Sequence, residues 1–181
     1  NASNSNAISE FRRKKYRPSK PLALMCASLN GLEISKVEKD TLESAVSPIV
    51  ILNIQIKNID LDVIAPYLSR VGVMLPYTPL HELLLEKFSK PIIATSGNIS
   101  NSPIVFENEK ALEELTQIAD LVLVNNREIV VPQDDSVIQF SPFKQQKIIL
   151  RRSRGLAPTY INPKLKLSSK SILAMGAMLK S

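Results

Sequence analysis

Residues 11–21, FRRKKYRPSKP, place arginine and lysine side chains in a short segment that two prolines stiffen. We expect a basic helix end that stops at Pro18 and continues as an extended chain, because proline lacks a backbone donor and restricts the residue before it. In an extended chain Lys15 and Arg17 point to the same side as exposed cations. Together with Lys20 they predict a site for the phosphates of a nucleotide, since arginine binds phosphate as a fork and lysine as a point charge. The alternative is a solvated basic helix end.

The segment ATSGNIS, residues 94–100, follows a short apolar stretch and offers small hydrogen-bonding groups. Ligands of open sheets commonly bind where strands end, and glycine lets the backbone approach a ligand closely. We therefore predict that Thr95, Ser96 and Asn98 contact the nucleotide. An ordinary strand-to-turn transition would have the same residues.

A second cationic cluster, RRSRG at residues 151–155, includes Arg152 and Arg154. A double-stranded RNA-binding surface is the competing hypothesis, but the chain has 5% aromatic residues and no tryptophan, which disfavours base stacking. Neither G-x-x-x-x-G-K-[ST] nor G-x-G-x-x-G occurs, so neither common nucleotide-binding loop is indicated. Asp134 and Asp135 precede Ser136 at the start of an expected strand, which indicates a turn or, as the sharper hypothesis, a contact with Mg²⁺.

The composition is that of a globular protein able to bury a core, with 181 residues, 44% hydrophobic, 22% charged and a net charge of +6. One histidine, His81, and one cysteine, Cys26, exclude a His/Cys metal cluster and an internal disulfide. We therefore predict no metal site built by the protein itself. No apolar stretch approaches the length of a bilayer span, and the polar N-terminus does not resemble a signal peptide. The expectation is a cytoplasmic protein without a membrane partner.

Strand-like and helix-like segments alternate without a regular βαβ period, which predicts an α+β or irregular α/β domain over residues 1–160. One expected helix is short, is capped by Asp40 or Thr41, and ends at Ser47. The other expected helices span residues 3–15, 60–68, 79–88 and 107–118. The expected strands span residues 21–27, 49–56, 72–75, 91–95, 121–124, 136–140 and 147–150.

Several segments resemble, in the same order, a known family. The basic segment and the later stretches resemble the YrdC/TsaC family and, within it, the YrdC-like domain of HypF-type hydrogenase maturation carbamoyltransferases. The later stretches are GVMLPYTPLHELLL (72–85), TSGNIS (95–100), NNREI (125–129), DDSV (134–137) and RRSRGLAP (151–158). Residues 172–180, ILAMGAMLK, resemble the start of the carbamoyl-transfer domain that follows in those proteins.

The resemblance implies a twisted mixed sheet flanked by helices, with residues 161–181 as a linker and the start of a following domain. Domains of this family open with a Lys-Gly-containing strand before the first helix, so the resemblance implies a fragment that lacks this strand. It also implies that Lys15 and Arg17 are catalytic residues that bind ATP phosphates. The remaining nucleotide-binding residues that it implies are Lys20, Thr95, Ser96, Asn98, Ser136 and either Arg152 or Arg154.

The reaction that the resemblance implies uses ATP with Mg²⁺, and carbamate derived from carbamoyl phosphate. Carbamate attacks the α-phosphate of ATP to give carbamoyl-adenylate and pyrophosphate, a step in cyanide-ligand synthesis for [NiFe] hydrogenase. The implied partners are the downstream carbamoyl-transfer domain and a maturation protein that accepts the carbamoyl group. The alternative within the wider family is a threonylcarbamoyl-adenylate synthase for tRNA modification.

Overall fold

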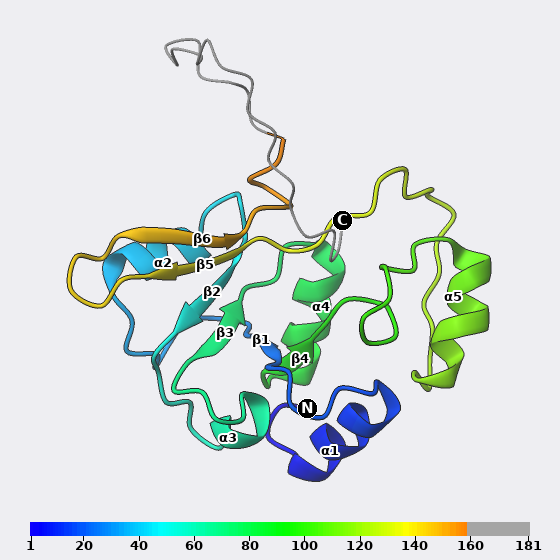
Figure 1. The fold of residues 1–181 in the computed structure, drawn as a ribbon, viewed down its shortest axis with the longest axis horizontal. Helices are drawn as coiled ribbons and strands as arrows, with labels where there is room; N and C mark the ends of the chain where they lie inside the picture. The colour runs from blue at the N-terminus through cyan, green and yellow to red at the C-terminus, as the bar shows by residue number, and fades with distance from the viewer. Residues whose placement is uncertain (159–181) are drawn as a thin grey trace, which may run out of the picture.

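Six short strands form one mixed sheet in the order β4-β1-β3-β2-β5-β6 (Figure 1). This computed structural model describes residues 1–158. The pairs β1–β3 and β2–β5 are parallel and the other neighbours are antiparallel, so the expected α+β mixed sheet is confirmed. The strands are β1 (Ala23–Met25), β2 (Ile49–Leu52), β3 (Val71–Met74), β4 (Ile92–Ala94), β5 (Val137–Phe140) and β6 (Lys147–Arg151).

The two faces of the sheet differ, because successive side chains of a strand point to opposite sides. Val50, Val73 and Ile138 are fully buried on one face, in the main hydrophobic core. Their strand neighbours, Ile49 and Gly72 among them, line a cavity on the other face. One face of the sheet is therefore packed over the main core, whereas the other packs a smaller second cluster at one end and leaves the rest of its surface to the cavity.

The described residues 1–158 form five α-helices. They are α1 (Ser5–Lys14), α2 (Lys36–Leu42), α3 (Leu61–Ile64), α4 (Pro79–Phe88) and α5 (Asn108–Glu114), and α5 continues as a short 3₁₀ turn. The first three contribute Ile8, Leu42 and Ile64 to the main core, whereas α4 inserts Leu85 into a second cluster with Met25. The predicted helix start at Thr78-Pro79 is confirmed, because the Thr78 hydroxyl accepts from the His81 amide.

Several expectations about the helices and strands were wrong. Helix α3 ends at Ile64 and not at residue 68, and β2 ends at Leu52 and not at residue 56. Helix α2 begins at Lys36, not after Asp40, because Ser35 and Glu38 form a capping box. Residues 121–124 form no strand in the structure, and Leu121 is 92% exposed because no neighbouring strand pairs with this segment. Leu112 of α5, which was expected to face inward, is half exposed because α5 lies away from the sheet (Figure 1).

None of the helices within residues 1–158 combines the length and apolar character needed to cross a bilayer. The linker and the domain start that we predict at residues 161–181 lie outside the described residues.

Candidate functional site

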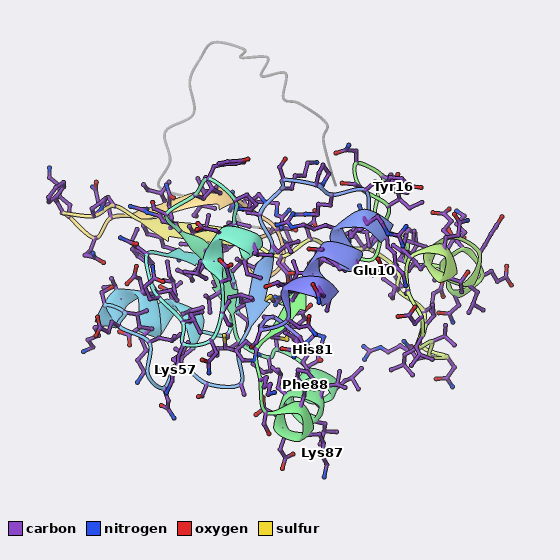
Figure 2. The ribbon with its side chains drawn as sticks, turned by 90° about the horizontal axis from the view of Figure 1, so that it is seen from below. Glu10, Tyr16, Lys57, His81, Lys87 and Phe88 are labelled. Carbon is purple, nitrogen blue, oxygen red and sulfur yellow. The ribbon has the colours of Figure 1, made fainter. Side chains whose placement is uncertain are left out.

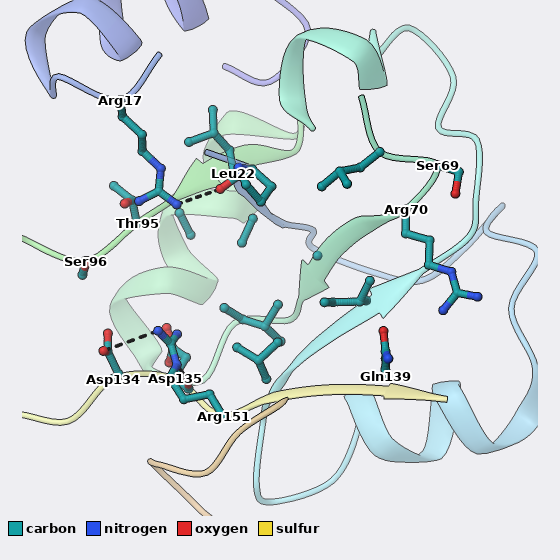
Figure 3. A pocket seen from close by; sticks show the side chains of 18 residues that line it. Arg17, Leu22, Ser69, Arg70, Thr95, Ser96, Asp134, Asp135, Gln139 and Arg151 are labelled. Atoms are coloured by element: carbon teal, nitrogen blue, oxygen red, sulfur yellow. Dashed lines mark hydrogen bonds and ion pairs between the residues drawn. The ribbon is translucent and has the colours of Figure 1, made fainter. Parts of the chain in front are cut away.

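A cavity of about 470 Å³ lies over the face of the sheet that α1, α2 and α3 leave uncovered (Figure 3). Its floor is apolar and includes Ala23, Ile49, Ile51, Gly72 and Val137. Its polar wall residues are Arg17, Ser69, Arg70, Thr95, Ser96, Asp134, Asp135, Gln139 and Arg151. An apolar floor with a few convergent polar groups is typical of a small-molecule site.

Lys15 is an internal contact and not an exposed cation. Its ammonium donates to the Thr95 hydroxyl at 2.8 Å and to the Ser96 carbonyl, and the residue is only 2% exposed. The expected extended chain after Lys15 was wrong, because Tyr16 adopts a left-handed conformation with φ of 51°. Tyr16 itself is exposed at the end of α1 (Figure 2). With this turn between them, the side chain of Arg17 lines the cavity and that of Lys15 does not.

Arg12 holds the basic segment in place, a role that sequence reasoning missed. It is buried, and its guanidinium donates to the carbonyls of Arg17 and Lys20, each at 2.9 Å. The same group donates to the carbonyl of Val63, also at 2.9 Å, in α3. Burial lowers the pKa of Arg12. A guanidinium bound to carbonyls of two segments fixes where the chain around Arg17 lies relative to the sheet.

Arg17 enters the cavity with a hydrogen-bond donor still available. Its Nη2 donates to the Pro21 carbonyl at 2.7 Å, and its buried Nε has no hydrogen-bond partner among residues 1–158. Burial lowers the pKa of Arg17, and the nearby charges of Arg12 and Arg151 lower it further. Cations held close together in a partly desolvated wall favour binding of an anion.

Some polar side chains of the loop after β4 line the cavity, and another forms hydrogen bonds within the loop. Thr95 and Ser96 line the cavity. Asn98 does not line it, because its buried side chain accepts from the Ser96 hydroxyl at 2.7 Å and donates to the Ser102 carbonyl. Lys20, also away from the cavity wall, donates to the Asn101 side chain. Asn98 and Lys20 thus stabilise the loop that presents Ser96.

Among the C-terminal arginines, Arg151 lines the cavity and the two that we predict from the sequence do not. Arg151 Nε donates to the Asp135 carbonyl at 2.8 Å, and its Nη1 lies 3.4 Å from Asp134 Oδ2. Arg152 is exposed and donates to the Leu156 carbonyl. Strand alternation gave no signal for Arg151, because a register shift between Val137 and Ile138 brings this last residue of β6 opposite Val137 in the cavity floor.

Arg154 and Ser136 connect chain segments behind the cavity wall. Arg154 pairs with Asp135 at 2.8 Å, donates to the Ser47 carbonyl, and lies 3.8 Å from the centre of the Tyr77 ring. The fully buried Ser136 hydroxyl donates to the Arg154 carbonyl at 2.8 Å. Neither residue lines the cavity, and both hold Asp135 and its neighbours in position.

The opposite end of the cavity carries Ser69, Arg70 and Gln139, which sequence reasoning missed (Figure 3). Gln139 could have been found, because it is a polar residue at an alternate position of an otherwise apolar strand. Arg70 lies in the loop before β3, and no sequence pattern marks it. The cavity therefore has polar groups at two ends and an apolar floor between them.

A magnesium ion that accompanies ATP needs few protein ligands, because it keeps several waters and phosphate oxygens. Residues 1–158 contain no group of three His, Cys, Asp or Glu side chains placed to hold a metal. The hydroxyl oxygens of Thr95 and Ser96 in the cavity wall are hard donors of the kind that Mg²⁺ accepts. The donor set fits a metal that arrives with its nucleotide.

An open mixed sheet with an arginine-lined cavity over part of one face is typical of a domain that binds a small anionic ligand. The family model of Sua5/YciO/YrdC proteins, described as telomere recombination, matches residues 1–153. The chain therefore belongs to the Sua5/YciO/YrdC family.

Within this family, the curated relatives that match the chain are carbamoyltransferases named HypF. The chain is 45% identical to the Synechocystis protein and 36% identical to that of Rhodobacter capsulatus, over 99% of its own length in both cases. It spans about a quarter of these relatives, because each match covers 24% of their length. A full-length HypF solved in a phosphate- and nucleotide-bound form has a TM-score of 0.82 and 42% identity over 87% of this chain and 25% of that chain. Sua5 from P. abyssi, solved with L-threonine, shares the fold, with a TM-score of 0.69 and 24% identity over 84% of this chain and 46% of that one.

Proposed function

We propose that this chain binds ATP in the cavity and forms carbamoyl-adenylate from carbamate. The observation that carries the proposal is Arg17, whose buried Nε has no partner within the described residues, at the edge of a 470 Å³ cavity with an apolar floor. The floor offers space for an adenine ring, and Arg17, Arg151 and Ser96 offer donors for phosphates. The HypF structure bound to phosphate and nucleotide supports this choice of ligand.

The proposed reaction requires the protein to supply positive charge and to align the reactants, and it requires no general base. The carbamate oxygen is already anionic when it attacks the α-phosphorus, and the bond from that phosphorus to the bridging oxygen breaks. The electron pair leaves with pyrophosphate, so no proton has to move. Arg17 and Arg151 would neutralise the phosphates and the leaving group, while Lys15 positions Thr95 and Ser96. Magnesium supplies further charge neutralisation when it arrives with ATP.

The names and the length of the relatives support a place for this reaction in a longer protein. Because they are named carbamoyltransferases and are about four times as long, we propose that carbamoyl-adenylate passes to a downstream carbamoyl-transfer domain. A maturation protein for [NiFe] hydrogenase would then accept the carbamoyl group. The threonine-dependent alternative rests on the family match and on the likeness of fold to Sua5. A double-stranded RNA module is disfavoured, because the polar groups converge on a concave cavity and not on a broad surface.

Calorimetric titration of this chain with ATP and Mg²⁺, followed by carbamoyl phosphate, tests the proposal. We expect ATP binding that Arg17→Ala weakens at least about tenfold, since a hydrogen bond to a charged group contributes roughly 1.5–3 kcal/mol. Arg13→Ala is the matched control, because Arg13 is exposed and pairs with Glu10 on the surface of α1. Unchanged ATP binding by Arg17→Ala would place the nucleotide elsewhere. Pyrophosphate exchange that requires threonine would overturn the choice of carbamate.

A further inference from the structure

Asp134 is an acidic side chain buried in the cavity wall beside Arg151. It is 8% exposed and lines the cavity. Its Oδ2 lies 3.4 Å from Arg151 Nη1, yet this oxygen accepts no hydrogen bond from any of the residues that the structure describes. Buried polar atoms nearly always have a hydrogen-bond partner, because leaving one unsatisfied is costly. The arrangement therefore points to a donor that arrives with the ligand.

The backbone around Asp134 is held from two sides. Its carbonyl accepts from the Arg154 amide at 3.1 Å, and Asp135 forms a β-bridge with Arg154. Two residues further on, the Ser136 carbonyl accepts from the Ile49 amide at 2.8 Å, which ties this segment to β2. The carboxylate is thus preorganised at the cavity wall and is not carried by a loose turn.

Asp134 lies at the end of the cavity that also carries Ser96 and Arg17 (Figure 3). Under the proposed function this is the phosphate end, so the acyl group attached to the α-phosphate lies there too. A carbamoyl group combines a carbonyl oxygen, which accepts hydrogen bonds, with an amino group, which donates them. Arg151 and Asp134 offer the complementary pattern, a donor beside an acceptor.

A magnesium ion on Asp134 is the competing explanation for the unsatisfied oxygen. The same Oδ2 already lies beside the Arg151 guanidinium, so a divalent cation there would be close to a second positive charge. Residues 1–158 also supply no cluster of three acidic, His or Cys side chains to help hold it. These observations favour an N–H donor over a metal ion.

We propose that Asp134 determines the acyl specificity of this site by accepting a hydrogen bond at Oδ2 from the amino group of the carbamoyl moiety. Arg151 donates to the neighbouring oxygen of the same moiety. The inference rests on the proposed function and identifies the residue that distinguishes a carbamoyl group from an acetyl group of similar size.

The test compares two stable mimics of an acyl-adenylate, N-carbamoylsulfamoyl adenosine and N-acetylsulfamoyl adenosine, by calorimetric titration of this chain. The two differ only in an amino group that replaces a methyl group. We expect the parent to bind the carbamoyl mimic at least about tenfold more tightly, the range typical of a hydrogen bond to a buried charge. Asp134→Asn should weaken this preference strongly, because a neutral amide oxygen accepts a weaker hydrogen bond than a carboxylate oxygen. Asp40→Asn, an exposed acid in α2, should keep it.

Each remaining outcome counts against one proposal or the other. Equal affinity of the parent for both mimics, with ATP binding intact, overturns the role of Asp134 and leaves the proposed function standing. Loss of magnesium-dependent ATP binding in Asp134→Asn makes Asp134 a metal ligand and also overturns the inference. Failure of the parent to bind ATP and both mimics contradicts the proposed function itself. A folded Asp134→Asn that keeps the full preference also overturns the inference. Absence of a preference in the parent overturns it even if the variant fails to fold, which thermal unfolding would reveal.

Discussion

Lys15 Nζ lies 2.8 Å from Thr95 Oγ1 and joins the end of α1 to the end of β4. The two residues are 80 positions apart in the chain. The same ammonium also donates to the Ser96 carbonyl. One buried lysine therefore holds both hydroxyl residues that the β4 loop contributes to the cavity wall.

Replacement of Lys15 should affect folding as well as binding. We expect Lys15→Ala to lower the free energy of unfolding by about 1–3 kcal/mol, because it removes two hydrogen bonds made by a buried ammonium. Urea unfolding at matched m-values measures the change. Lys14→Ala is the control, since its ion pair with the exposed Asp120 should contribute at most about 1 kcal/mol. A Lys15→Ala protein as stable as the parent would contradict the buried contact.

Arg12 should be intolerant of lysine. Arg12→Lys keeps a positive charge but cannot reproduce the fork that binds carbonyls of the basic segment and of α3. We expect a loss of about 2–4 kcal/mol in unfolding free energy and weaker ATP binding, because Arg17 loses its anchored backbone. Thermal unfolding and ATP titration measure the two effects. Arg13→Lys, on the exposed face of α1, should behave like the parent; equal effects of both substitutions would refute the anchoring role.

Arg151 and Arg152 are adjacent in sequence and should differ in function. Arg151→Ala should weaken ATP binding by about tenfold or more, because it removes a cation from the cavity wall. Arg152→Ala should change the affinity by less than about twofold, since its side chain is exposed and bound to the Leu156 carbonyl. Isothermal titration of the two variants compares them directly. A larger effect from Arg152 would reverse the assignment.

Gly72 should be required for the open floor of the cavity. A β-carbon at this position would lie 2.9 Å from Ile49 Cγ2. Gly72→Ala should therefore cost about 1–3 kcal/mol of stability and reduce ATP affinity. Ile49→Ala removes the clashing methyl group, so the double variant should lose less stability than the sum of the single variants. Additive effects in this cycle would show that the clash is not the cause.

The stability of the fold should fall at alkaline pH through Cys26. Burial raises the pKa of the thiol from 9.0 to about 11. The stabilisation from keeping this thiol neutral is fully present below the pKa of the unfolded chain and is lost as the pH rises to about 11. Cys26→Ala has no such group, so the stability of the parent relative to this variant should drop by about 2 kcal/mol between about pH 9 and pH 11. A constant difference across this range would contradict the shift.

Local sequence patterns predicted much of the fold. The cap at Thr78-Pro79 and the β-branched run at β2 were readable, because both depend on a few neighbouring residues. The start of α2 was misjudged although Ser35 and Glu38 carry a capping-box pattern. The apolar run at residues 121–124 misled the prediction, because a strand forms only where another strand accepts its hydrogen bonds.

The sequence by itself determined the alternation that gives the sheet two different faces, and it indicated which segments carry the polar groups. Arg17, Thr95 and Ser96 lie in the cavity wall, and their contact with a nucleotide stays a prediction. Only the tertiary structure decided that Arg151, not Arg152 or Arg154, reaches the cavity and that Lys15 points inward. The direction of a side chain at a helix end or in a loop depends on contacts with residues far away in the chain. Such contacts leave no periodic signal in the sequence.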